Sequence, residues 1–121
     1  LGYFPSQIKL NYFYRFADLC VFPSEYESFG YTIIQAMSYG KALIATKVGG
    51  IPELVSNGEN GLLIKPNKPR DLAKAINTLI SDDELRSRLS RNAFISVKNS
   101  FSMEKFRLRT QKLYTSLLKN P

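Results

Sequence analysis

Three short, largely apolar runs place the strongest constraint on how this chain can fold. They cover residues 19–22, 42–46 and 62–64, and each is followed by turn-forming or loop residues. Apolar runs of this length, without polar alternation, are typical of strands that are buried on both faces of a parallel sheet. Helical patterns precede, separate and follow the runs. The sequence therefore predicts an α/β fold built on a parallel sheet.

Apolar residues at helical spacing fill most of the remaining chain. We expect Ser6 to cap the first helix, Gly40 to end the second in a left-handed conformation, and Pro69 to lie in the first turn of the fourth. The sequence Ser81-Asp82-Asp83-Glu84 has the pattern of a capping box, with Ser81 as the cap. The expected helices cover residues 6–17, 29–39, 52–55, 69–81, a segment starting near 81, and 102–119.

The last of these helices carries several large apolar side chains, which we expect to be buried in the core or between domains. They are Phe106, Leu113, Tyr114, Leu117 and Leu118.

The chain of 121 residues has no histidine and a single cysteine, Cys20. This excludes Ser-His and Cys-His nucleophile systems and the usual zinc sites within the sequence. Cys20 lies in an apolar run, so we expect a packed thiol rather than a reactive one. One cysteine allows no internal disulfide, which fits a reducing compartment and predicts a cytoplasmic protein. No apolar run approaches the ~20 residues that span a bilayer.

Positive charge gathers in the last third of the chain. Residues 1–81 hold eight basic and six acidic residues, whereas residues 82–121 hold nine and four. The simplest interpretation is a solvated helix face. A peripheral contact with the inner face of a membrane is the alternative. The tail lacks the interleaved aromatic residues of a nucleic-acid platform, so we expect no nucleic-acid partner.

The segment 23–40 has the composition of an anion-binding site. A predicted strand leads through Pro23 to two carboxylates, Glu25 and Glu27, and then to Gly30 at a helix start. The amides of a helix N-terminus favour negative charge. A carboxylate beside them would repel a bare phosphate but suits a ligand with hydroxyl groups next to its phosphates, such as a nucleotide sugar.

An ordered set of motifs then resembles the group-1 (family 4) retaining glycosyltransferases of GT-B architecture. The similarity runs through essentially the whole chain, from Ala17 to Tyr114. The matching pieces are Ala17-Asp18, Pro23-Ser24, residues 27–30, Ala36-Met37, Gly40, residues 48–53, residues 58–61, Leu72-Ala73, Ala75-Ile76, Phe101-Ser102 and Tyr114.

This resemblance implies a nucleotide diphosphate sugar as donor, a glycan, lipid or small-molecule acceptor, and no metal or other cofactor. It implies that Glu27 is the catalytic carboxylate that positions the donor sugar. It also implies that the nucleotide is held by Ser28, Phe29, Gly30, Tyr31, Thr32 and Gln35. The family motif places a second glutamate where this chain has Gln35. A neutral amide can still contact the ribose, but more weakly than a carboxylate.

Three strands are few for such a sheet, and Leu1-Gly2-Tyr3-Phe4 looks like the tail of another strand. We therefore expect residues 1–121 to form part of a C-terminal, Rossmann-like nucleotide-sugar-binding domain with C-terminal helices. The upstream half and the acceptor domain would belong to a longer parent. The family's basic pair for the leaving diphosphate lies in that upstream half, so the isolated chain should be inactive.

Two alternatives belong to other functional classes. Gln35 would also suit a degenerate, non-catalytic module that binds nucleotide sugars or serves as a scaffold. A sugar-nucleotide epimerase on the same architecture needs ionisable groups for proton transfer, which the lack of histidine disfavours.

Overall fold

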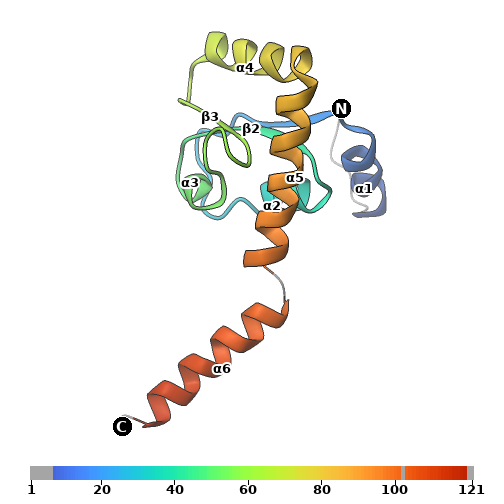
Figure 1. Ribbon diagram of the computed structural model, residues 1–121. Coiled ribbons are helices and arrows are strands. Elements are labelled where there is room, and N and C mark those ends of the chain that lie inside the picture. The colour runs from blue at the N-terminus through green and yellow to red at the C-terminus, as the bar shows by residue number, and fades with distance from the viewer. Residues whose placement is uncertain (1–6, 102, 120–121) are drawn as a thin grey trace.

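The computed structural model describes residues 7–101 and 103–119, and within this part three strands alternate with helices (Figure 1). Two predictions, Ser6 as a helix cap and residues 1–4 as the tail of a strand, lie outside the described residues. The elements are α1 (Gln7–Phe16), β1 (Leu19–Phe22), α2 (Tyr31–Ser38), β2 (Ala42–Thr46), α3 (Ile51–Leu54), β3 (Leu62–Ile64), α4 (Pro69–Ser81), α5 (Asp83–Ser100) and α6 (Met103–Lys119).

The strands form one parallel sheet in the order β1-β2-β3, which confirms the predicted fold class. Leu19 pairs with Ala42, and Ile44 pairs with Leu62. Every residue of the central strand β2 is buried, in agreement with its apolar sequence, which only Thr46 at its end interrupts. Because all three strands run the same way, their carboxyl ends lie at one edge of the sheet.

Helices cover both faces of this sheet. One face packs on α2 and α3, where Ile33, Met37 and Leu54 meet Leu43 of β2. The other face packs on α4 and the first half of α5, where Leu79 and Leu89 meet Ala42 and Ile44. Burying both faces gives the small domain two hydrophobic clusters that share the central strand.

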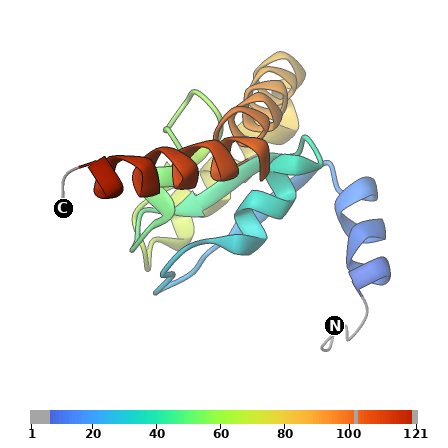
Figure 2. The same cartoon turned by 90° about the horizontal axis from the view of Figure 1, so that it is seen from below.

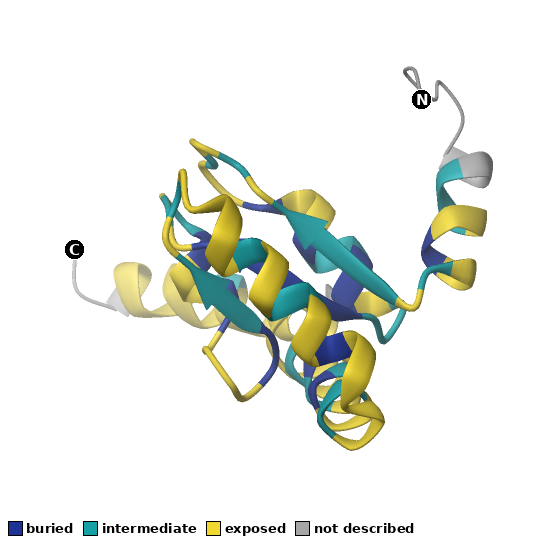
Figure 3. Cartoon of the chain, turned by 90° about the horizontal axis from the view of Figure 1, so that it is seen from above, coloured by how far each residue is buried: buried dark blue, intermediate teal, exposed yellow. Residues whose placement is uncertain are grey.

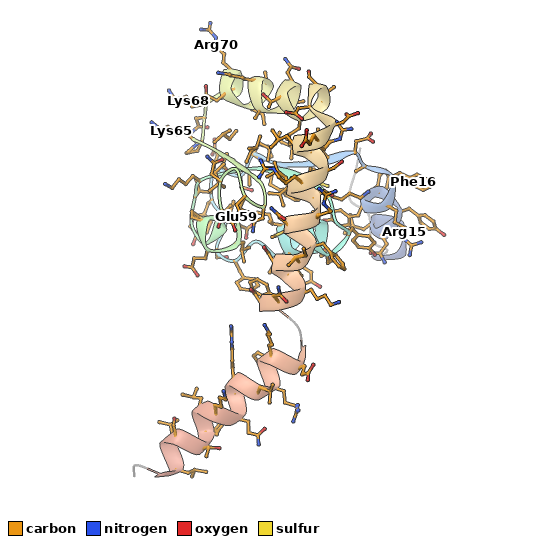
Figure 4. All side chains as sticks on the ribbon, viewed as in Figure 1. Arg15, Phe16, Glu59, Lys65, Lys68 and Arg70 are labelled. Carbon is orange, nitrogen blue, oxygen red and sulfur yellow. The ribbon has the colours of Figure 1, made fainter. Side chains whose placement is uncertain are left out.

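Helix α5 runs across the amino ends of the strands (Figures 1 and 2). Its side chains bind backbone that leads into β2 and β3. Ser90 donates to the Gly40 carbonyl, Arg88 Nη1 to the Gly58 carbonyl at 3.2 Å, and Asn92 Nδ2 to the Glu59 carbonyl at 2.8 Å. Glu59 lies beside α5 in Figure 4. The amino edge of the sheet is thus closed, and the carboxyl edge is left for a site.

Gly40 and Pro69 have their predicted roles, with a φ of +62° and the first position of α4. The predicted cap of α5 is wrong by one residue. Ser81 is the last residue of α4, where its hydroxyl donates to the Asn77 carbonyl. The cap is Asp82, whose carboxylate accepts from the Leu85 amide at 2.8 Å. An aspartate oxygen reaches an amide three residues ahead as readily as a serine hydroxyl does.

The expected burial of the α6 side chains in the core is also wrong, whereas their burial between domains stays a prediction. Phe106, Leu113, Tyr114, Leu117 and Leu118 are all exposed, and Leu118 is 81% exposed. The helix extends away from the body of the fold, and its described surface is exposed almost throughout (Figures 1 and 3). The periodicity correctly predicted an amphipathic helix, but no described residue covers its apolar face. None of the described helices is long and apolar enough to cross a membrane.

Helix α1 stands at the margin of the fold beyond β1, and Arg15 and Phe16 extend outward from it (Figures 2 and 4). Its inward residue is Tyr14, which stacks on Tyr39 with ring centroids 5.5 Å apart. Lys41 Nζ donates to the Arg15 carbonyl at 2.9 Å, a favourable position for a cation because it lies at a helix C-terminus.

Candidate functional site

The loops that follow β1 and β2 meet at the carboxyl edge of the sheet. They are the glutamate loop, residues 23–30, and the glycine turn, residues 47–50. Thr46, the last residue of β2, connects the glycine turn to the glutamate loop because its hydroxyl donates to the Ser24 carbonyl at 2.5 Å. Thr46 is only 3% exposed. Open α/β sheets bind ligands outside the carboxyl ends of their strands, so this is where a ligand site is expected.

The Glu27 carboxylate closes the glutamate loop on itself. Its Oε1 accepts from the Gly30 amide at 3.0 Å and from the Phe29 amide at 3.3 Å. A single oxygen makes both contacts, and these hydrogen bonds leave Oε2 for a ligand. Glu27 therefore stands at the start of α2 with one oxygen fixed, an arrangement that holds the carboxylate in a defined orientation.

The backbone of the glycine turn packs directly against the backbone of the glutamate loop. The Gly50 amide donates to the Glu27 carbonyl at 3.1 Å. A Cβ added at Gly49 would lie 1.8 Å from the Glu27 carbonyl oxygen, and one at Gly50 would lie 2.5 Å from that of Ser28. Only residues without a side chain allow the two loops to approach so closely. These two glycines therefore form a tight turn against the glutamate loop.

Gly30 is the N-cap of α2 and has a φ of +82°. The structure shows a packing reason for a glycine at this position. The position of the missing Cβ faces the core, 2.8 Å from Leu54 Cδ1. The glycine is needed for this backbone conformation and packing, and its amide is the group that faces the Glu27 carboxylate.

The amides of Tyr31 and Thr32 open helix α2. The first intrahelical bond of this turn is donated by Ile33 to the Gly30 carbonyl, at 3.0 Å, so the two preceding amides have no helical acceptor. Both residues are exposed at the carboxyl edge. The Tyr14 hydroxyl donates to the Thr32 carbonyl at 3.3 Å and joins α1 to this turn. Burial raises the pKa of Tyr14 above its ordinary value, with smaller contributions from Cys20, Tyr31 and Tyr39.

The other predicted residues lie around this core of the site. Ser28 and Phe29 are exposed on the glutamate loop, and Phe29 packs edge-on against Phe101 with ring centroids 6.5 Å apart. Gln35 is half-buried one turn further along α2, on the side of Tyr31 because residues four apart share a helix face. Glu25 is fully within the loop and exposed. The structure thus gathers the residues of the segment 27–35 at one edge.

Thr46 is a positioning residue that the sequence interpretation missed. The signal was present as the one hydroxyl at the end of an otherwise apolar run, A-L-I-A-T. A buried hydroxyl needs a partner, and here the partner is the loop that leaves the neighbouring strand. Among the described side chains, no three His, Cys, Asp or Glu residues lie close enough together to hold a metal ion.

Comparison with known proteins agrees with this geometry. The family model of the group 1 glycosyl transferases matches residues 1–95. A D-inositol 3-phosphate glycosyltransferase of Corynebacterium glutamicum is 37% identical over 107 residues, which is 88% of this chain and 25% of the relative.

Solved structures of glycosyltransferases share the fold. A sucrose-phosphate synthase of Thermosynechococcus elongatus is 36% identical at a TM-score of 0.81, over 90% of this chain and 27% of that one. The Anabaena protein HepE in complex with UDP is 32% identical at a TM-score of 0.85, over 96% of this chain and 31% of that one. HepE is also known in complex with UDP-glucose.

The chain thus spans about a quarter to a third of the length of these relatives. The match of the family model covers most of the chain, including both loops of the site. This protein belongs to the group 1 glycosyl transferase family and carries a domain of GT-B, Rossmann-like fold.

Proposed function

We propose that this chain is the donor-binding part of a retaining glycosyltransferase. The parent enzyme would transfer a hexose from a nucleotide diphosphate sugar to a hydroxyl group of an acceptor. The observation that carries the proposal is the Glu27 carboxylate, held by one oxygen at the start of α2 beside the Tyr31 and Thr32 amides. A carboxylate oxygen accepts from sugar hydroxyls, and free amides at a helix start donate to phosphate.

The predicted residues other than Ser28 then divide among four roles. Glu27 Oε2 orients the sugar ring, and the amides at Tyr31 and Thr32 hold the diphosphate. The Phe29 and Gly30 amides position the carboxylate, since both already donate to it. Gln35, one turn along the helix, contacts the ribose. The complexes of HepE with UDP and UDP-glucose support a uridine nucleotide as the donor.

Catalysis needs more than this donor site. The developing charge on the leaving diphosphate must be stabilised, and such stabilisation is usually a large part of the barrier reduction. The basic pair that serves this purpose in the family has no counterpart in residues 1–121. We therefore propose that the 121-residue chain alone binds nucleotide but does not turn over. Its location would be cytoplasmic.

The test is calorimetric titration of the intact protein with UDP, combined with transfer assays on two variants. Glu27→Gln keeps an oxygen for the Phe29 and Gly30 amides but presents an amide group to the sugar. We expect it to lose transfer while still binding UDP. Glu25→Gln removes the same charge from the same loop and should leave both properties unchanged.

The outcomes separate the functional classes. Retention is tested by the anomeric configuration of the product. UDP binding without any transfer by the intact wild-type protein would instead support a non-catalytic module. Absence of nucleotide binding, or full transfer activity of Glu27→Gln, would refute the proposed role of this loop.

A further inference from the structure

Helix α5 ends beside the glutamate loop. Its second half packs on α2, since Ala93 belongs to the cluster that contains Ile33, and Val97 packs against that cluster. The C-cap of α5 is Phe101, whose amide donates to the Val97 carbonyl at 2.9 Å. Beyond this residue, α6 extends away from the body of the fold (Figure 1). Phe101 is therefore anchored to the core through its own helix.

The Phe101 ring contacts the glutamate loop through Phe29. The two rings meet edge-on, with their centroids 6.5 Å apart and their planes at 81°. Aromatic pairs favour an edge-to-face arrangement at this distance. The sequence pair Phe101-Ser102 is one of the pieces that resemble the family, yet the proposed function gives Phe101 no role. Its contact with the donor loop suggests where such a role lies.

Phe29 connects this aromatic contact to the Glu27 carboxylate. Its amide donates to Glu27 Oε1 at 3.3 Å, and the Gly30 amide donates to the same oxygen at 3.0 Å. The glycine turn lies against the same residue, since a Cβ added at Gly50 would be 3.6 Å from Phe29 Cα. Phe29 is thus held by its backbone at the glycine turn and by its ring at Phe101. A shift of the ring would move the amide that holds the carboxylate.

We propose that Phe101 is a positioning residue for the donor sugar and that it acts through Phe29 on Glu27. The proposal rests on the proposed function, because it takes the Glu27 carboxylate as the group that binds the sugar. The diphosphate would be held by the Tyr31 and Thr32 amides, whose positions are fixed by helix α2 itself. Loss of the Phe101 ring should therefore weaken binding of a nucleotide sugar and leave binding of the nucleotide alone unchanged.

The first measurement needs no ligand. Amide hydrogen exchange in the intact protein follows the Gly30 amide, which its hydrogen bond to Glu27 protects. An edge-to-face aromatic pair changes an equilibrium by a factor of about two to twelve. We expect the Gly30 amide to exchange faster by a factor in this range in Phe101→Ala, because the loop opens more often without the ring.

The second measurement is calorimetric titration of the intact protein with UDP and with UDP-glucose. Phe101→Ala should weaken UDP-glucose binding by about two- to twelvefold and keep the affinity for UDP within twofold of wild type. A merely structural role would instead lower both affinities together. Phe101→Tyr keeps the ring, so it should restore the exchange of the Gly30 amide and the affinity for UDP-glucose to within twofold of wild type.

Phe94→Ala is the matched control. It removes the same side chain from the same helix, and Phe94 is 46% exposed where Phe101 is 42% exposed. The control should leave both the exchange of the Gly30 amide and the affinity for UDP-glucose unchanged. If Phe94→Ala and Phe101→Ala have equal effects, a general loosening of α5 explains them and the proposal is overturned.

A double-mutant cycle tests the route through Phe29. Phe29→Ala removes the ring but keeps the backbone amide that donates to Glu27. Phe29→Ala combined with Phe101→Ala should bind UDP-glucose no more weakly than the weaker single variant, because either change alone removes the contact. Losses that multiply in the double variant would mean that the two rings act independently, and would overturn the proposal.

The remaining outcomes separate this proposal from the proposed function. If the wild-type protein binds UDP-glucose and Phe101→Ala binds it equally well, only the role of Phe101 is overturned. Unchanged exchange of the Gly30 amide in Phe101→Ala would have the same meaning. If the wild-type protein binds neither UDP nor UDP-glucose, the proposed function is refuted, and the role of Phe101 in sugar binding with it.

Discussion

The contact between the glycine turn and the glutamate loop makes a sharp prediction for Gly49→Ala. Gly49 has a φ of +48°, and an alanine in this left-handed conformation costs about 1 kcal/mol. Its Cβ would also lie 1.8 Å from the Glu27 carbonyl oxygen, whereas ordinary contact begins near 3.4 Å. The two loops must therefore separate by about 1.6 Å, the difference between these distances.

Such a separation has a second cost. The neighbouring hydrogen bond from the Gly50 amide to the Glu27 carbonyl is 3.1 Å long and would break. Its loss costs about 1 kcal/mol, so together with the conformational cost we expect Gly49→Ala to lower the free energy of unfolding by about 2 kcal/mol. The Glu27 carboxylate would move with its loop, and a displacement of about 1 Å can reduce transfer roughly 100-fold.

Gly58 provides the matched control. Its φ is +77°, but a Cβ added there meets nothing within 4 Å. Gly58→Ala should therefore cost about 1 kcal/mol of stability, from the left-handed conformation alone, and leave transfer unchanged. Urea unfolding and transfer assays on both variants of the intact protein make the comparison. Equal losses of stability with equal transfer rates would refute the steric reasoning.

Further predictions concern a contact with the ligand, a buried hydrogen-bond network and the thiol. Gln35→Glu should tighten UDP binding roughly fivefold in calorimetry, because a charge-assisted bond is stronger than a neutral one by about 1 kcal/mol. Asn60→Ala should cost about 2–3 kcal/mol in urea unfolding, since the buried amide makes three hydrogen bonds, whereas Asn92→Ala loses one and should cost about 1 kcal/mol. Burial raises the pKa of Cys20, partly offset by Lys41, so its alkylation at mildly alkaline pH should be slower than that of an unfolded thiol. Because the pKa of Cys20 is higher in the folded state than in the unfolded state, the free energy of unfolding should fall as pH rises past the ordinary thiol pKa. Cys20→Ala should reduce this dependence of stability on pH.

Local patterns predicted the elements of this fold well, because each is specified by neighbouring residues. The strands 19–22, 42–46 and 62–64 are confirmed to the residue. The runs are apolar except for Thr46, and each is followed by polar or turn-forming residues, so both their type and their bounds can be read locally. The shift of the α5 cap from Ser81 to Asp82 shows the limit, since two adjacent residues can serve as caps and only packing selects one.

Features that depend on distant residues could not be predicted. The periodicity of α6 indicates a face that would gain from burial, but a pattern does not specify the surface that buries it. Leu117 and its neighbours are exposed because none of the described residues supplies that surface. Likewise, the sequence marks Gly49 as a turn residue, yet its fit under Glu27 depends on two parallel strands placing their loops side by side.

Glu27 can complement the positive end of α2 and bind a sugar at the same time in this geometry. A carboxylate has two oxygens, and here Oε1 accepts both loop amides. That contact complements the positive end of α2 and also fixes the direction in which Oε2 can face a ligand. A carboxylate that was only a cap would need no support beneath its backbone. The close approach of Gly49 and Gly50 to Glu27 and Ser28 provides such support, and it restricts the loop more than capping alone requires. The contact between the glycine turn and the glutamate loop would therefore help to hold the Glu27 carboxylate in the orientation that binds a sugar.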